Sequence, residues 1–187
     1  MKKIIIPVIA LLVLFTVTPV MTAPATKISF TGWGSFGFGN VSPGEVWITD
    51  DGVSHVKGAV SQGEVTIQSV LGPMKMEIIM VHDLALDSNT GLGDCHGKFI
   101  LGYFDEVSIL DGVPIIEGLR LFEGTEHGSH IITNDGHYIS GGLQAKGIGD
   151  FKGVKMQSSY EGEITEGEVV DIDLDGTLLA PHPLPGM

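Results

Sequence analysis

Cysteine and basic residues are scarce in this chain of 187 residues. It contains one Cys, and its 10 Lys and Arg residues stand against 23 Asp and Glu, for a formal net charge of −13. A single thiol cannot form a disulfide within the chain. The acidic balance excludes a nucleic-acid binder, because affinity for phosphates comes from clustered Lys and Arg. Charged residues make up only 18% of the chain and hydrophobic ones 43%, which excludes a disordered chain as well.

Long apolar runs are rare too, and the longest lies near residue 1. Two lysines precede an apolar run over 4–17, and Ala-Pro-Ala at 23–25 offers small residues for cleavage. This layout predicts a secretory signal peptide over 1–25, with an uncleaved membrane anchor as the alternative. Cleavage would leave one domain over 26–187 with a net charge of −15. We therefore expect a protein that is secreted or lies at the cell exterior or in the periplasm, without membrane contact after cleavage.

After residue 26 the sequence shows no convincing helix, and alternation with a period of two is the dominant pattern. Over 74–86 and 168–179, apolar side chains alternate with polar or charged ones, as on half-buried strands. Asp-Gly pairs at 51–52, 111–112 and 135–136 favour tight hairpin turns. The pattern predicts an all-β fold, a single antiparallel barrel of about eight strands, with a lipocalin-like barrel or a β-sandwich as alternatives. The expected strands lie at 27–38, 45–49, 53–60, 63–70, 74–86, 95–107, 115–123, 129–133, 137–146, 152–162 and 168–179.

Glycine is the residue that is unusually common, with 27 copies. The segments 91–97 and 147–153 both read Gly-aliphatic-Gly-Asp-x-basic-Gly before an expected strand. The stretch 147–154, followed by an alternating strand to Tyr160, resembles a segment of the allene oxide cyclase and dirigent barrel-like superfamily, in which such a turn leads into a late barrel strand. The resemblance implies an eight-stranded barrel over about 27–180 whose lumen holds an apolar small molecule. It assigns no catalytic residue.

Two short motifs match known sites in spacing but not in context. Residues 32–37 have the glycine spacing of a dinucleotide-binding loop, yet the following residues cannot start the helix that such a loop needs, so no cofactor is expected. Residues 171–176 match the start of an EF-hand loop, but position twelve is His182 instead of Glu. We interpret these aspartates as the outer face of a strand, and 87–94, a second calcium-like loop, as a hairpin connection.

Four residues are candidates for a ligand site in the barrel lumen. His82 lies on the apolar face of 74–86, where it is either a satisfied core histidine or an acid–base group. Cys95 and Tyr103 fall on the same face of 95–107, and the thiol is expected to be buried and inert. Arg120 is the only arginine and alternates with apolar residues, so it could hold a carboxylate in the lumen or pair with a neighbouring acid at the surface.

Histidines between 127 and 137 are weak candidates for metal ligands. His127, His130 and His137 lie near acidic residues, and imidazole with carboxylate suits zinc. On a strand, however, His127 and His130 point to opposite faces and cannot share an ion. Our prediction is therefore that the protein has no metal site.

Three functions are open at this point. The first is a secreted barrel that binds an apolar small molecule without turnover, because the chain has apolar strand faces, three Met residues at 74, 76 and 80, and no ordered catalytic motif. The second is an isomerase or cyclase of the allene oxide cyclase type, which rests on the resemblance alone. The third is an extracellular structural or interaction protein that presents an acidic surface. The oligomeric state is left open.

Overall fold

Nine strands and one short 3-10 helix make up the described part of the computed structural model. The structure describes residues 25–110, 113–165 and 169–181, so the expected signal peptide lies almost wholly outside the described residues. The elements are β1 (Thr26–Gly37), β2 (Glu45–Ile48), β3 (Val53–Ser69), β4 (Gly72–Asp87), β5 (Leu92–Leu110), β6 (Val113–Thr133), β7 (Gly136–Gly147), η1 (Gly149–Phe151), β8 (Lys155–Thr165) and β9 (Val169–Ala180).

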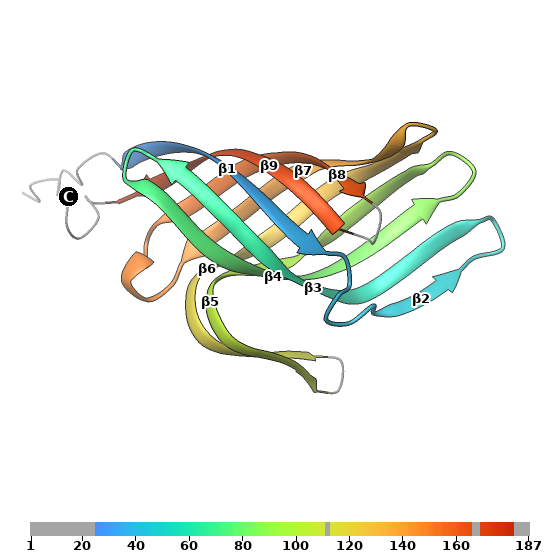
Figure 1. The fold of residues 1–187 in the computed structure, drawn as a ribbon, viewed down its shortest axis with the longest axis horizontal. Coiled ribbons are helices and arrows are strands. Elements are labelled where there is room, and N and C mark those ends of the chain that lie inside the picture. Colours follow the sequence, from blue (N-terminus) through green and yellow to red (C-terminus); the bar gives the residue numbers. More distant parts are fainter. Residues whose placement is uncertain (1–24, 111–112, 166–168, 182–187) are drawn as a thin grey trace, which may run out of the picture.

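The strands form a closed antiparallel barrel. Each of β3 to β9 pairs with its neighbour in the chain, and β1 pairs with both β9 and β3, which closes the ring of eight strands (Figure 1). The ninth strand, β2, pairs only with the first part of β3 and lies outside the ring. The predicted all-β barrel of about eight strands is confirmed.

Two strands each join two segments that the alternation predicted as separate strands. The expected strands 53–60 and 63–70 are one strand, β3, with an irregularity between Val56 and Ala59. Likewise 115–123 and 129–133 both belong to β6. The outer part of the β5–β6 hairpin bends away from the barrel as a two-stranded arm (Figure 1). The arm follows register shifts between Leu101 and Gly102 and between Phe104 and Glu106.

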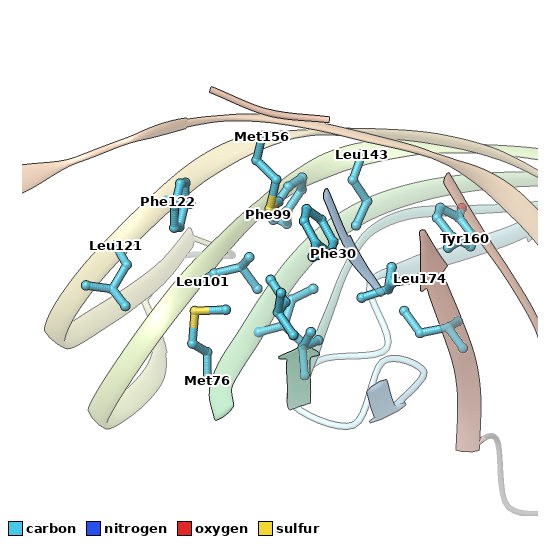
Figure 2. Packing of buried hydrophobic residues seen from close by; sticks show 14 of the residues in the cluster. Phe30, Met76, Phe99, Leu101, Leu121, Phe122, Leu143, Met156, Tyr160 and Leu174 are labelled. Carbon is cyan, nitrogen blue, oxygen red and sulfur yellow. The ribbon is translucent and has the colours of Figure 1, made fainter. Parts of the chain in front are cut away.

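Apolar side chains fill most of the barrel lumen. Figure 2 shows Phe30 from β1 beside Phe99 and Leu101 from β5. Inward-facing glycines make room for them; a Cβ at Gly63, for example, would overlap Phe36 on the neighbouring strand. The core cluster consists of Ile28, Phe30, Phe36, Val65, Ile67, Met76, Ile78, Met80, Phe99, Leu101, Leu121, Phe122, Ile139, Leu143, Val154, Met156, Tyr160, Val170, Ile172, Leu174, Leu178 and Ala180.

The outward face of β9 carries the aspartates of the EF-hand-like motif. Asp171, Asp173 and Asp175 are exposed and alternate with buried aliphatic residues, as the strand interpretation predicted. Residues 32–37 lie within β1, so no helix follows the glycines there. Within the described part of the chain, none of the helical segments has the length and apolar character needed to cross a membrane.

Candidate functional site

Five polar side chains meet inside the barrel, in a core that is otherwise mainly apolar. We call them the buried polar cluster, and they come from five strands: Ser61 from β3, His82 from β4, Cys95 from β5, Glu126 from β6 and Tyr160 from β8. Each lies on the inward face of its strand, and each exposes less than a tenth of its surface. Because burying a polar group is costly unless it has partners, the contacts within the cluster decide its chemistry.

Ser61, His82 and Glu126 form a chain of three groups. The Ser61 Oγ lies 3.1 Å from His82 Nε2, and His82 Nδ1 lies 3.9 Å from Glu126 Oε2. The backbone N–H of Gly39 donates to the Ser61 Oγ over 2.8 Å, which leaves the hydroxyl hydrogen free to be donated to Nε2. From these partners we assign the neutral tautomer of His82 with its proton on Nδ1, directed toward Glu126.

Glu126 is only partly satisfied. Its Oε1 accepts a hydrogen bond from the Tyr160 hydroxyl over 2.9 Å, and the Cys95 Sγ lies 3.9 Å away. Its Oε2 is buried and has no hydrogen-bond partner among the described residues. An unsatisfied buried carboxyl oxygen costs about 1–3 kcal/mol or more, so its presence calls for a functional explanation.

Burial shifts the proton equilibria of the cluster away from their ordinary values. It raises the pKa of Glu126 to about 7 and lowers the pKa of His82 to about 4. Burial, followed by the neighbouring Glu126 carboxyl, raises the pKa of Cys95 to about 12. Around neutral pH, His82 is therefore uncharged, Cys95 is a thiol and Glu126 is partly protonated. The contact between His82 and Glu126 is not a permanent ion pair.

Two glycines leave the space that the Tyr160 ring occupies. Gly128 on β6 and Gly141 on β7 lie opposite each other, and Gly141 lies opposite Tyr160 on β8. A Cβ on either glycine would overlap the Tyr160 hydroxyl. The missing side chains therefore allow the hydroxyl to reach Glu126.

A loop between β1 and β2 covers the cluster. The Phe38 ring stacks on the His82 ring, with centroids 4.6 Å apart. The Asn40 side chain donates to the Gln62 carbonyl over 3.0 Å and accepts from the Gln62 N–H over 2.8 Å. These contacts hold the loop against β3 directly beside Ser61.

A second candidate region is a groove on the outer face of β6, β7, β8, β9 and β1. Its hollow measures about 730 Å³, which is within the range of small-ligand sites. Trp33, 55% exposed, stands on β1, and Tyr138 stands on β7. We call this region the outer groove, and its carboxylates are Glu161, Glu163, Asp171 and Asp173.

The four groove carboxylates face one another without a cation. Glu161 lies directly opposite Asp173, and Glu163 lies directly opposite Asp171. Like charges placed opposite each other across two strands are destabilising. The ion pairs formed by the described residues involve none of these four, and the residues that line the hollow include no Lys or Arg. The groove therefore concentrates negative charge beside an exposed indole ring.

Comparisons with known proteins give no relative. No protein family, curated protein or solved structure matches this chain. The two regions must be interpreted from their own geometry.

The structure separates the four lumen candidates into two pairs. His82 and Cys95 face the interior and belong to the buried polar cluster. Tyr103 and Arg120 do not line the lumen; both are exposed and lie where the arm leaves the barrel. The guanidinium of Arg120 donates to the Ile116 carbonyl within its own strand. The placement of these two residues in the lumen is therefore wrong.

A β-bulge accounts for the placement of Arg120. Leu101 pairs with Phe122 and Gly102 pairs with Arg120, so Leu121 is an extra residue in β6. Leu121 and Phe122 are consequently both buried. The shift puts Arg120 on the outward side, although strict alternation would put it on the same face as Phe122.

The histidine group also divides between the two faces of the sheet. His127 is exposed, whereas His130 is buried and its Nδ1 lies 2.9 Å from His137 Nε2. Burial is the main cause that lowers the pKa of both His130, to about 4, and His137. No group of three or more His, Cys, Asp or Glu side chains among the described residues is arranged to hold a metal ion.

Ser61, Glu126 and Tyr160 are the cluster residues that the sequence analysis did not single out as site candidates. Ser61 and Glu126 fall in the gaps between expected strands, although both gaps are parts of longer strands. Alternation carried from Phe122 through Glu126 to His130 would have put all three on the inward face.

Proposed function

We propose that the protein is an extracellular binding protein that holds a cationic chain in its outer groove. The ligand class is a chain of ammonium groups joined by methylene groups, as in aliphatic polyamines or lysine-rich segments. The observation that carries this proposal is the two pairs of facing carboxylates that line the hollow, Glu161 with Asp173 and Glu163 with Asp171, which form no ion pair among the described residues. The extracellular location rests on the signal-peptide pattern of 1–25 and stays a prediction.

The spacing of the groove supports a linear ligand. Directly opposed residues on antiparallel strands have Cβ atoms about 5 Å apart, and residues two positions apart on one strand are separated by about 7 Å. The carboxylates thus form two rows across the strands, between which an extended chain can lie. Trp33, directly opposite Asp173, offers an indole face to an ammonium group.

The lumen is the other place where we expected a ligand. Side chains of the core cluster occupy it (Figure 2), and the described residues line an open hollow outside instead. An apolar small molecule in the lumen, and a cyclase reaction of the allene oxide cyclase type, therefore stay predictions without a supporting contact. The groove is the better supported location.

Calorimetric titration with spermine and with tetralysine tests the proposal. We expect saturable binding at low salt that weakens as salt screens the charges. The double variant Glu161→Gln/Asp173→Asn should bind about tenfold more weakly, which corresponds to about 1.4 kcal/mol. Spermine alone binding would indicate a polyamine ligand, and tetralysine alone a peptide.

A matched control uses another facing acidic pair. Glu106 and Glu117 lie opposite each other on the arm, outside the groove. The variant Glu106→Gln/Glu117→Gln removes the same charge and should leave binding unchanged. Absence of binding to both probes, or an equal loss in the control variant, would overturn the proposal.

A further inference from the structure

The chain of Ser61, His82 and Glu126 has the arrangement of a nucleophile, a base and an acid that orients the base. A hydroxyl within hydrogen-bond distance of an imidazole nitrogen, with a carboxyl group at the other nitrogen, is how serine is activated for acyl transfer. The first distance is 3.1 Å, and the second, 3.9 Å, is long. Catalytic hydrogen bonds are often long in structures without substrate.

We propose that the buried polar cluster is a serine acyl-transfer site that hydrolyses esters of small apolar acyl groups. Ser61 and His82 are its catalytic residues, and Glu126 is a positioning residue that acts through His82. The inference goes beyond cation binding in the outer groove and does not depend on it. It gives the unpartnered Oε2 of Glu126 a role, since that oxygen faces Nδ1 of the imidazole ring, which is positively charged while Nε2 holds the proton from Ser61.

The reaction balances with water as the second substrate. The Ser61 oxygen forms a bond to the ester carbonyl carbon while its proton passes to His82 Nε2. The ester C–O bond breaks, and the leaving alkoxide takes that proton. A water molecule then gives a proton to His82 and attacks the acyl carbon. Ser61 leaves as an alkoxide and recovers its proton from His82.

The residues around Ser61 set the size of the acyl group. Ser61 lies opposite Met80, which in turn lies opposite Phe99, and both side chains are fully buried in the core. Little depth is therefore present below the hydroxyl, which favours a small acyl group. The Gly39 N–H donates to the Ser61 Oγ over 2.8 Å, so a backbone donor lies beside the atom that attacks the carbonyl carbon.

Phe38 is the group that covers the site. Its ring stacks on His82, and Ser61 itself has no exposed surface. Access for a substrate therefore requires the Phe38 side chain to leave the face of the imidazole. Replacing this ring by a methyl group should open the site while keeping the hydrogen bond from Gly39.

Labelling with an alkyl fluorophosphonate tests the inference. The probe forms a covalent bond between phosphorus and the serine oxygen, and fluoride leaves. We expect one adduct per chain, located on Ser61 by peptide mass spectrometry of the wild-type protein. Phe38→Ala should react about tenfold faster. Ser61→Ala and His82→Gln should lose at least about 100-fold of the labelling rate.

Ser158 supplies the matched control. Its hydroxyl is also buried in the barrel, but it makes no hydrogen bond to a histidine or to any other group among the described residues. Ser158→Ala should label as the wild type does. Peptide mapping of the wild-type adduct keeps the test decisive even if Ser61→Ala does not fold.

The pH profile distinguishes a positioning role for Glu126 from a purely structural one. The labelling rate should rise as Glu126 ionises, around pH 7, and Glu126→Gln should react more slowly and without this rise. An adduct that maps to a residue other than Ser61, or no adduct in both the wild type and Phe38→Ala, would overturn the inference.

Discussion

The inside and the outside of this barrel both gather carboxyl groups, but under opposite conditions. Inside, a single carboxyl group, Glu126, is enclosed by neutral partners, and burial keeps it partly protonated at neutral pH. Outside, the four groove carboxylates stand in water and repel one another across β8 and β9. Burial decides the charge of the first region, while the solvent and its ions decide the energy of the second. The same residue type can therefore serve proton transfer in one place and cation binding in the other.

Acid should affect the inside most strongly. Burial lowers the pKa of His82 and of His130 from 6.5 to about 4, so the folded protein binds fewer protons than the unfolded chain between those values. Their contribution to stability is complete above pH 6.5 and is lost as the pH falls toward 4. For both together, this is on the order of 5 kcal/mol.

Urea unfolding between pH 7 and pH 4 measures this loss. The free energy of unfolding of His82→Gln/His130→Gln should decline less steeply than that of the wild type. His96, exposed on β5, provides the control, and His96→Gln should keep the wild-type slope. Parallel slopes in all three proteins would show that the interior histidines titrate as they do in the unfolded chain.

A substitution that fills the space beside Tyr160 should also destabilise the fold. A side chain at Gly128 would overlap the Tyr160 hydroxyl and approach the Ser140 carbonyl. Gly128→Val should therefore destabilise the fold by about 3–4 kcal/mol, measured by chemical unfolding. Ser29→Ala, on the outward face of β1, should change the stability by less than about 0.5 kcal/mol. A stable Gly128→Val protein would mean that Tyr160 can leave Glu126 at little cost.

A rise in pH from acid to neutral should act on Glu126. Burial raises its pKa from 4.5 to about 7, so the folded protein binds more protons than the unfolded chain in that window. The free energy of unfolding should fall by about 3 kcal/mol as the pH rises from 4.5 to above 7, relative to Glu126→Gln. Thermal unfolding of both proteins across this range gives the difference. Coincident pH profiles would contradict the buried acid.

The smallest effect is expected in the outer groove, and its sign is reversed. Glu161→Gln removes one of two opposed charges and should stabilise the fold by about 0.2–1 kcal/mol at low salt. The gain should shrink when salt is added, because the repulsion is screened. Melting temperatures at two salt concentrations measure it. A destabilised variant would indicate that the groove carboxylates support the fold instead of straining it.

The period of two predicted most of the architecture but only part of the site. It placed His82 and Cys95 on inward faces, because a strand's alternation is insensitive to which strand lies beside it. It could not predict the placement of Arg120, since the extra residue Leu121 appears only when β6 is paired with β5. Glu126 was missed because glycines on both sides of it look like a break between strands, although here they make room for neighbouring side chains.

The pairing of β1 with β9 sets an order of events for the chain. The ring closes only when residues near position 30 meet residues near position 175, the most distant pairing in the sequence. Until then β1 and β9 both carry unpaired edges, which invite contact with other chains. Contacts so far apart in sequence also slow folding. The barrel can therefore close only after β9 has been synthesised. Until then, the unpaired strand edges must be kept from pairing with other copies of the chain.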